Sequence, residues 1–142
     1  MKKKVIILGA TGHVGSYMTL YAKDFFADKG MEVIASGRRE KADVFAQMGV
    51  QYISVDMTKA EDFEKLPQDN VHAVIQLAAE IPAYMDGYEP KKYLDSIIYG
   101  TYNVLEYCRR ANVDRHLFST TCFDVWEYPK DKTIMPNDPL NY

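Results

Sequence analysis

Residues 4–15 read KVIILGATGHVG. The run from Lys4 to Leu8 is rich in β-branched residues and apolar from Val5 onward, which is typical of a central strand covered on both faces. From His13 to about Ala27, apolar residues recur at spacings of three and four, which predicts a helix. Gly9, Gly12 and Gly15 therefore lie between a strand and a helix, where a phosphate-binding turn is expected.

The three glycines have separate roles in such a turn. Gly9 permits the tight bend, Gly12 lets the backbone approach a diphosphate, and Gly15 lets the helix pack close to the sheet. Free amides at the start of the helix then face the anion, and we place Thr11 in the same cofactor-binding set. A glycine-rich turn that binds nothing is the alternative, but the strand before it and the helix after it favour a dinucleotide.

Alternating strands and helices continue along the chain, which predicts a parallel sheet joined by crossover helices. Further strands are expected at residues 32–36, 51–56, 72–79 and 115–120, and further helices at about 42–48 and 88–111. The fold class is a doubly wound, Rossmann-type α/β sheet of about five strands, in one domain over residues 1–142. Because the complete fold uses six strands, we expect the sixth strand and a C-terminal substrate domain to be absent.

The second strand ends in the sequence ASGRRE, residues 35–40. NAD-binding proteins place an acidic residue here to bind the ribose 2′-hydroxyl group, and this chain has Gly37 instead. Arg38 and Arg39 follow, and the arginine fork suits a 2′-phosphate, which predicts NADP. NAD stays open as the alternative because Glu40 lies close by, and the two arginines could also be a simple solvated loop.

Composition excludes several classes of protein. The 142 residues carry 17 Lys and Arg against 20 Asp and Glu, a net charge of −3, and the charges are scattered, which predicts no nucleic-acid partner. Cys108 and Cys122 form neither a disulfide framework nor a zinc site, so we expect reduced thiols, a cytoplasmic protein and no metal. The apolar run near the N-terminus breaks at Gly9, and no stretch reaches the roughly 20 apolar residues that span a bilayer.

Four segments together resemble one known family. GATGHVG, VDMTK, IQLAA and GTYNVLEYCRRANVDRHLFSTT occur in the order seen in the extended short-chain dehydrogenase/reductases, also called NAD-dependent epimerase/dehydratases. The resemblance implies that His13 and Val14 lie against the diphosphate and that Asp56 with Met57 borders the adenine. Asp56 could equally be a simple strand-end cap.

The resemblance also implies roles near the reacting end of the cofactor. Its nicotinamide side would be lined by a short segment of small residues, which crowding at a strand end could also explain: Leu77, Ala78 and Ala79. Thr121, or second Thr120, would contact the reacting oxygen of the substrate. One departure is Ile97, which stands where the family often has Asn; Ser96 lies beside it.

Family members use a tyrosine as the base and a lysine four residues later. Tyr88 with Lys92 and Tyr128 with Lys132 have this spacing, but prolines next to or between them make both poor candidates. The resemblance places the tyrosine at or just beyond Tyr142, so we expect the chain as given to lack its lysine and to be inactive.

The implied activity of the whole protein is reversible hydride transfer between NADP, or NAD, and a hydroxyl-bearing, nucleotide-sugar-like substrate. The alternative is a non-catalytic NADP-sensing regulator of the same fold. The helix predicted over residues 88–111 carries tyrosines on several faces, and family helices at this place pair across a dimer. We therefore expect a homo-oligomer.

Overall fold

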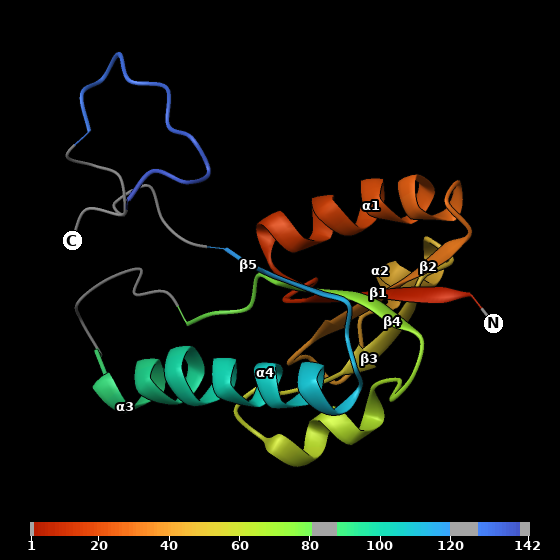
Figure 1. The fold of residues 1–142 in the computed structure, drawn as a ribbon. Helices are drawn as coiled ribbons and strands as arrows, with labels where there is room; N and C mark the ends of the chain where they lie inside the picture. The colour runs from red at the N-terminus through yellow and green to blue at the C-terminus, as the bar shows by residue number, and fades with distance from the viewer. Residues whose placement is uncertain (1, 81–87, 120–127, 140–142) are drawn as a thin grey trace.

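The computed structural model describes residues 2–80, 88–119 and 128–139. It contains a five-stranded parallel sheet in the order β3-β2-β1-β4-β5 (Figure 1). The strands are β1 (Lys3–Leu8), β2 (Met31–Gly37), β3 (Gln51–Ser54), β4 (Val71–Gln76) and β5 (Arg115–Phe118). The predicted Rossmann-type sheet is thereby confirmed.

Helical segments cover both faces of this sheet, with α1 and the α3–α4 segment on opposite sides (Figure 1). One face is covered by α1 (His13–Ala27) and α2 (Asp43–Gln47). The other carries the 3-10 helix η1 (Ala60–Lys65) and a helical segment made of α3 (Pro90–Tyr93), the π-helical η2 (Leu94–Tyr99) and α4 (Gly100–Arg110). Two apolar cores result: Val5 and Ile7 point into the first, and Ile6 and Leu8 into the second.

The strand register brings the carboxyl ends of four strands together. Leu8 at the end of β1 aligns with Ser36 of β2 and with Gln76 of β4. The strands predicted over residues 51–56 and 72–79 end earlier than expected, at Ser54 and Gln76. The residues beyond these ends leave the ladder, which frees them to line a site above the sheet.

The face that α1 turns toward the sheet differs from the one expected from its largest apolar side chains. Its buried residues are Gly15, Thr19 and Ala22, whereas Val14, Tyr21 and Phe25 are exposed. The physical reason is distance: a Cβ at Gly15 would lie 2.1 Å from the carbonyl oxygen of Gly9. A helix this close to the strand ends can present only small residues to the sheet.

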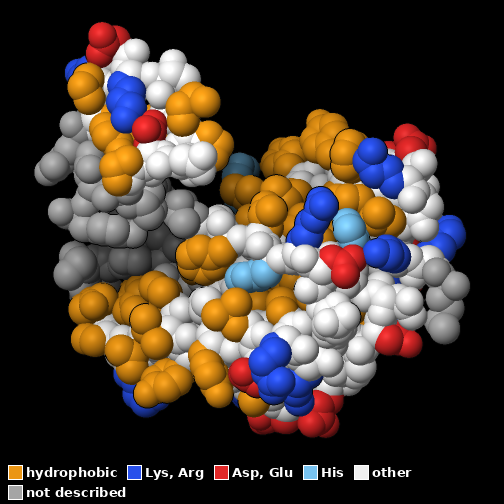
Figure 2. Space-filling view, viewed as in Figure 1, with side chains coloured by type: hydrophobic (Ala, Val, Ile, Leu, Met, Phe, Trp, Pro, Cys, Tyr) orange, Lys and Arg blue, Asp and Glu red, His pale blue; other side chains and the backbone are white. Residues whose placement is uncertain are grey.

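The segment from α3 to α4 also turns a different face inward. Its buried residues are small or lie deep in the core: Ser96, Gly100, Val104, Tyr107 and Ala111. Large apolar side chains of this segment are exposed instead: Leu94, Ile97, Ile98 and Leu105. Figure 2 shows hydrophobic side chains gathered over this segment and along α1. In the part of the chain that the structure describes, no helix is both long and apolar enough to cross a bilayer.

Candidate functional site

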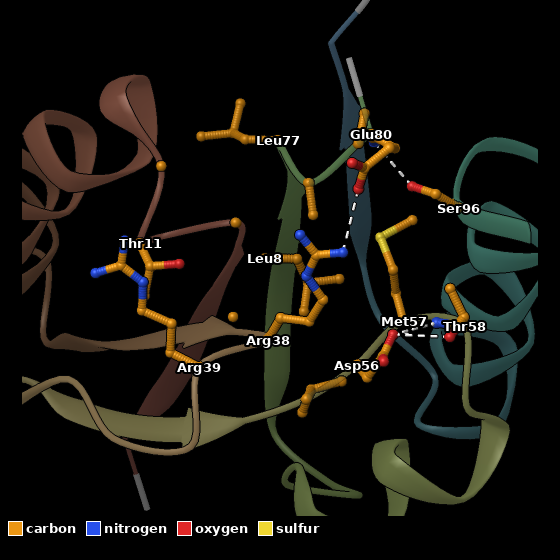
Figure 3. Close-up of a pocket in the computed structure, with 16 residues that line it drawn as sticks. Leu8, Thr11, Arg38, Arg39, Asp56, Met57, Thr58, Leu77, Glu80 and Ser96 are labelled. Carbon is orange, nitrogen blue, oxygen red and sulfur yellow. Dashed lines mark hydrogen bonds and ion pairs between the residues drawn. The ribbon is translucent and has the colours of Figure 1, made fainter. Parts of the chain in front are cut away.

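A cleft of about 290 Å³ lies at the carboxyl edge of the sheet, where ligands bind in open α/β folds (Figure 3). Residues that follow four strands line it. They are Leu8, Gly9, Thr11 and Gly12 at the end of β1; Gly37, Arg38 and Arg39 at the end of β2; Val55, Asp56, Met57 and Thr58 after β3; and Leu77, Ala78, Ala79 and Glu80 after β4. Ser96 of η2 completes the lining.

The glycine turn is held from both neighbouring strands. The amides of Gly9 and Ala10 each donate to the carbonyl oxygen of Ser36, at 2.9 Å. Gly9 has φ +90°, and a Cβ there would lie 2.6 Å from the amide nitrogen of Ala78. Only glycine combines this conformation with so close an approach. The turn is therefore fixed in place before any ligand arrives.

The N-terminus of α1 suits an anion. Gly12 is the N-cap, no side chain caps the helix there, and the first turn contains no acidic residue. First-turn amides lack intrahelical partners, and the helix dipole adds positive potential at this end. A Cβ at Gly12 would meet only the Gly9 carbonyl oxygen, at 3.3 Å. The turn therefore fits the diphosphate of a dinucleotide.

A side chain in place of Gly37, at the end of β2, would press on the side chain of Thr11. A Cβ at Gly37 would lie 2.9 Å from the Thr11 hydroxyl oxygen. The Tyr52 hydroxyl anchors the loop after β2. It lies 2.9 Å from the carbonyl oxygen of Gly37 and 2.6 Å from that of Arg39, within hydrogen-bond distance of both. Burial raises the pKa of Tyr52, which keeps the hydroxyl protonated and able to donate. The loop thus holds Arg38 and Arg39 at the cleft.

Asp56 both lines the cleft and caps the turn after β3. Its Oδ1 accepts hydrogen bonds from the amide and the hydroxyl of Thr58, at 3.0 and 2.8 Å. The Asp56 amide donates to Asp62 at 2.8 Å, and the Lys65 hydrogen bond is the main cause that lowers the pKa of Asp62. Met57 is buried, and its carbonyl oxygen accepts from the Asn103 side chain at 2.9 Å. Hydrogen bonds therefore hold this wall of the cleft in place.

The buried side-chain amide of Gln76, at the end of β4, connects this strand to its neighbours. Gln76 is 1% exposed; its side chain donates to the Thr101 hydroxyl at 2.9 Å and lies 3.1 Å from Nε2 of His116. Burial lowers the pKa of His116, and a neutral ring with the proton on Nε2 can donate to Gln76. This network joins α4, β4 and β5 directly below the cleft.

Comparison with known proteins settles the family. The model of the NAD dependent epimerase/dehydratase family matches residues 5–141. The chain belongs to this family.

Individual relatives agree with the assignment. The chain is 27% identical to a probable UDP-arabinose 4-epimerase 3 of Arabidopsis thaliana, over 96% of its own length and 36% of the relative's. It is 23% identical to a putative UDP-glucose 4-epimerase of Methanocaldococcus jannaschii, over 96% and 44% of the two lengths. The chain thus spans less than half of the curated relatives it matches.

Solved structures share the fold. A UDP-glucose 4-epimerase of Thermus thermophilus in complex with NAD superposes with a TM-score of 0.68 at 22% identity, over 97% of this chain and 44% of that one. A mutant uronate dehydrogenase of Agrobacterium tumefaciens in complex with NAD gives a TM-score of 0.70 at 18% identity, over 99% and 49%.

Most predicted cofactor-binding residues of this epimerase/dehydratase family member meet at the cleft. Those that line it are Gly9, Thr11, Gly12, Arg38, Arg39, Asp56, Met57, Leu77, Ala78 and Ala79. His13 and Val14 instead border a separate apolar hollow along α1, and Gly15 is buried beneath the turn. None of these three residues lines the cleft, so they contribute to the turn only through their backbone groups. Thr121 and Tyr142 lie outside the described residues.

Glu80 and Ser96 line the cleft although sequence reasoning did not select them as site residues. Ser96 had a usable signal, because it is a polar residue within an apolar helical stretch. Glu80 had none, since nothing local distinguishes it from a solvated carboxylate. In the described ranges, no group of three His, Cys, Asp or Glu side chains is placed to hold a metal ion.

Neither described Tyr and Lys pair has a catalytic arrangement. Tyr88 stacks on Tyr93 with ring centroids 4.9 Å apart, and Lys92 pairs with Glu89. At the second candidate, Tyr128 donates to the Pro139 carbonyl oxygen, and Lys132 pairs with Asp138. Neither tyrosine lines the cleft.

Proposed function

We propose that this chain is the dinucleotide-binding part of an NADP-preferring oxidoreductase, epimerase or dehydratase. The supporting observation is the cleft, in which a glycine turn, an uncapped helix N-terminus and two arginines meet at the carboxyl ends of four strands. The substrate is hydroxyl-bearing and nucleotide-sugar-like, and the similarity to a probable UDP-arabinose 4-epimerase and a putative UDP-glucose 4-epimerase supports this class.

Each wall of the cleft suits one part of the cofactor. The diphosphate lies against the glycine turn, the adenosine beside Asp56 and Met57, and the nicotinamide side along Leu77 to Ala79. The bound nicotinamide supplies the hydride carrier. Thr121 orients the substrate hydroxyl and Tyr142 takes its proton in this proposal.

The preference for NADP rests on the loop after β2. Because a Cβ at Gly37 would already press on the Thr11 side chain, a carboxylate there would have to displace that side chain. Arg38 and Arg39 place up to ten N–H donors at the same rim. This rim is suited to a 2′-phosphate and lacks, at Gly37, the acceptor that favours NAD.

Titration with NADPH and NADH, followed by fluorescence or calorimetry, tests the proposal. Arg38→Ala should weaken NADPH binding about tenfold or more, because a charge-assisted hydrogen bond contributes about 1.5–3 kcal/mol. Arg115→Ala is the matched control, since Arg115 lies at the opposite, amino edge of the sheet. Failure of the wild-type chain to bind either dinucleotide would contradict the proposal, and equal losses in the two variants would contradict the role of Arg38.

The second candidate is the non-catalytic NADP-sensing regulator. It would keep the same dinucleotide cleft and would lack a working Tyr and Lys pair. Incubating the whole protein with UDP-glucose or UDP-arabinose separates the candidates. Conversion of the sugar, followed by NMR, supports the enzyme, and tight NADPH binding with no conversion supports the regulator.

Self-association belongs to the same proposal. The α3–α4 segment and the residues just before it expose several large apolar side chains: Tyr88, Leu94, Ile97, Ile98, Tyr99, Tyr102 and Leu105. Apolar surface of this extent is typical of an interface. We place the contact between two copies of the chain on this face.

A further inference from the structure

An ion pair crosses the cleft. Nη1 of Arg38 lies 3.1 Å from Oε2 of Glu80, and the two residues are 42 positions apart in the sequence. Arg38 follows β2 and Glu80 lies beyond the end of β4, while β1 lies between these strands in the sheet. The pair therefore spans the carboxyl end of β1, where the glycine turn begins. Figure 3 shows the Arg38 side chain reaching across to Glu80.

Glu80 is the anchored partner of this pair. Its backbone amide donates to the Ser96 hydroxyl at 2.9 Å, and Ser96 is only 9% exposed. The Glu80 side chain is 33% exposed, whereas that of Arg38 is 72% exposed. Opening the pair would thus move Arg38 toward solvent and leave Glu80 where it is.

The proposed function gives this geometry a consequence. A dinucleotide that runs from the Asp56 wall to the Ala78 wall has to pass over the end of β1. This path is the one that the Arg38–Glu80 pair occupies. The pair must open for either dinucleotide, and only a 2′-phosphate offers Arg38 a replacement anion.

We propose that Glu80 controls access to the dinucleotide site by holding Arg38 across it. This inference rests on the proposed function. Glu80 is a positioning residue, because it acts on the ligand through Arg38. In the ligand-free protein the Arg38–Glu80 pair lowers the affinity for both dinucleotides, and the 2′-phosphate of NADP offsets the loss.

Three variants test this, with NADH as the decisive ligand. Glu80→Gln and Arg38→Ala change the net charge in opposite directions, so a general electrostatic effect would move NADH affinity in opposite directions. If the pair obstructs the cleft, both variants should bind NADH about two- to five-fold more tightly, the range expected for an exposed pair. The double variant should gain no more than either single one, because the obstacle is already removed.

NADPH separates the two residues. Glu80→Gln should tighten NADPH binding by the same factor, whereas Arg38→Ala should weaken it. Glu106→Gln, in an exposed pair with Arg109 on α4, removes the same charge away from the cleft and should leave both dissociation constants unchanged.

The results distinguish this inference from the proposed function. If the wild type binds dinucleotides but NADH affinity is unchanged, or shifts in opposite directions in the two single variants, the role of Glu80 is wrong and the proposed function stands. If the wild type and all variants bind neither dinucleotide, both are wrong. Thermal melts of each variant check that the fold is intact.

Discussion

Replacing Gly15 by alanine would place a methyl carbon 2.1 Å from the carbonyl oxygen of Gly9, inside the turn that carries α1. Ordinary van der Waals contact begins at 3.4 Å, so 1.3 Å is missing. The same Cβ would lie 2.8 Å from Cα of Ala10, so the backbone of two consecutive turn residues opposes it. Either α1 lifts from the sheet or the turn after β1 deforms.

The expected loss follows from two opposing terms. Overpacking costs about 1–3 kcal/mol, and a clash with backbone belongs at the upper end of this range. Alanine in a helix recovers about 1 kcal/mol relative to glycine. We expect the free energy of unfolding of Gly15→Ala to fall by about 2 kcal/mol, which lowers Tm by about 8 °C for a chain of this size.

Gly12→Ala is the matched control in the same turn. Its Cβ would meet one atom, the Gly9 carbonyl oxygen at 3.3 Å, so stability should change by less than about 0.5 kcal/mol. Its methyl group would instead keep the diphosphate away from the turn and weaken NADPH binding about tenfold, since a charge-assisted hydrogen bond contributes about 1.5–3 kcal/mol. Urea unfolding and NADPH titration measure the two effects. Equal unfolding free energies for the two variants, or unchanged NADPH binding by Gly12→Ala, would refute the assigned roles.

Two further predictions concern the core and the surface. Burial holds the pKa of His116 below its ordinary value of 6.5, so the unfolded chain takes up the proton first as pH falls. Stability should therefore decrease as pH falls below about 6.5, and urea unfolding of His116→Gln should show a smaller decrease; an equal decrease would contradict the assignment. Ile98→Asp should shift the protein toward monomer in light scattering, while Val44→Asp, on the exposed side of α2, should not. An unchanged mass for Ile98→Asp would place the contact elsewhere.

Strand order and the site were largely predictable because they depend on local signals. The glycine turn fixes β1, the turn and α1 within a dozen residues, and parallel neighbours then bring the strand ends to one edge. The orientation of helices was less predictable. Apolar residues at helical spacing predict that large side chains face the sheet, whereas close packing at Gly15 and Gly100 selects small ones. A Cβ at Gly100 would lie 2.6 Å from Cε of Met57, a contact that no spacing pattern contains.

The π-helical η2 explains why Ser96 rather than Ile97 acts at the cleft. A π turn holds more residues than an α turn, so it rotates the side chains before it relative to those of α4, and such turns are frequent at functional sites. Ser96 is consequently 9% exposed, and its hydroxyl accepts a hydrogen bond from the Glu80 amide, whereas Ile97 is 42% exposed. The family often has Asn at the position of Ile97, but in this chain the polar group that faces inward is one residue earlier. Because the Ser96 hydroxyl accepts a hydrogen bond from the Glu80 amide and Glu80 pairs with Arg38, this shift in helical phase connects the long helix to the loop after β2.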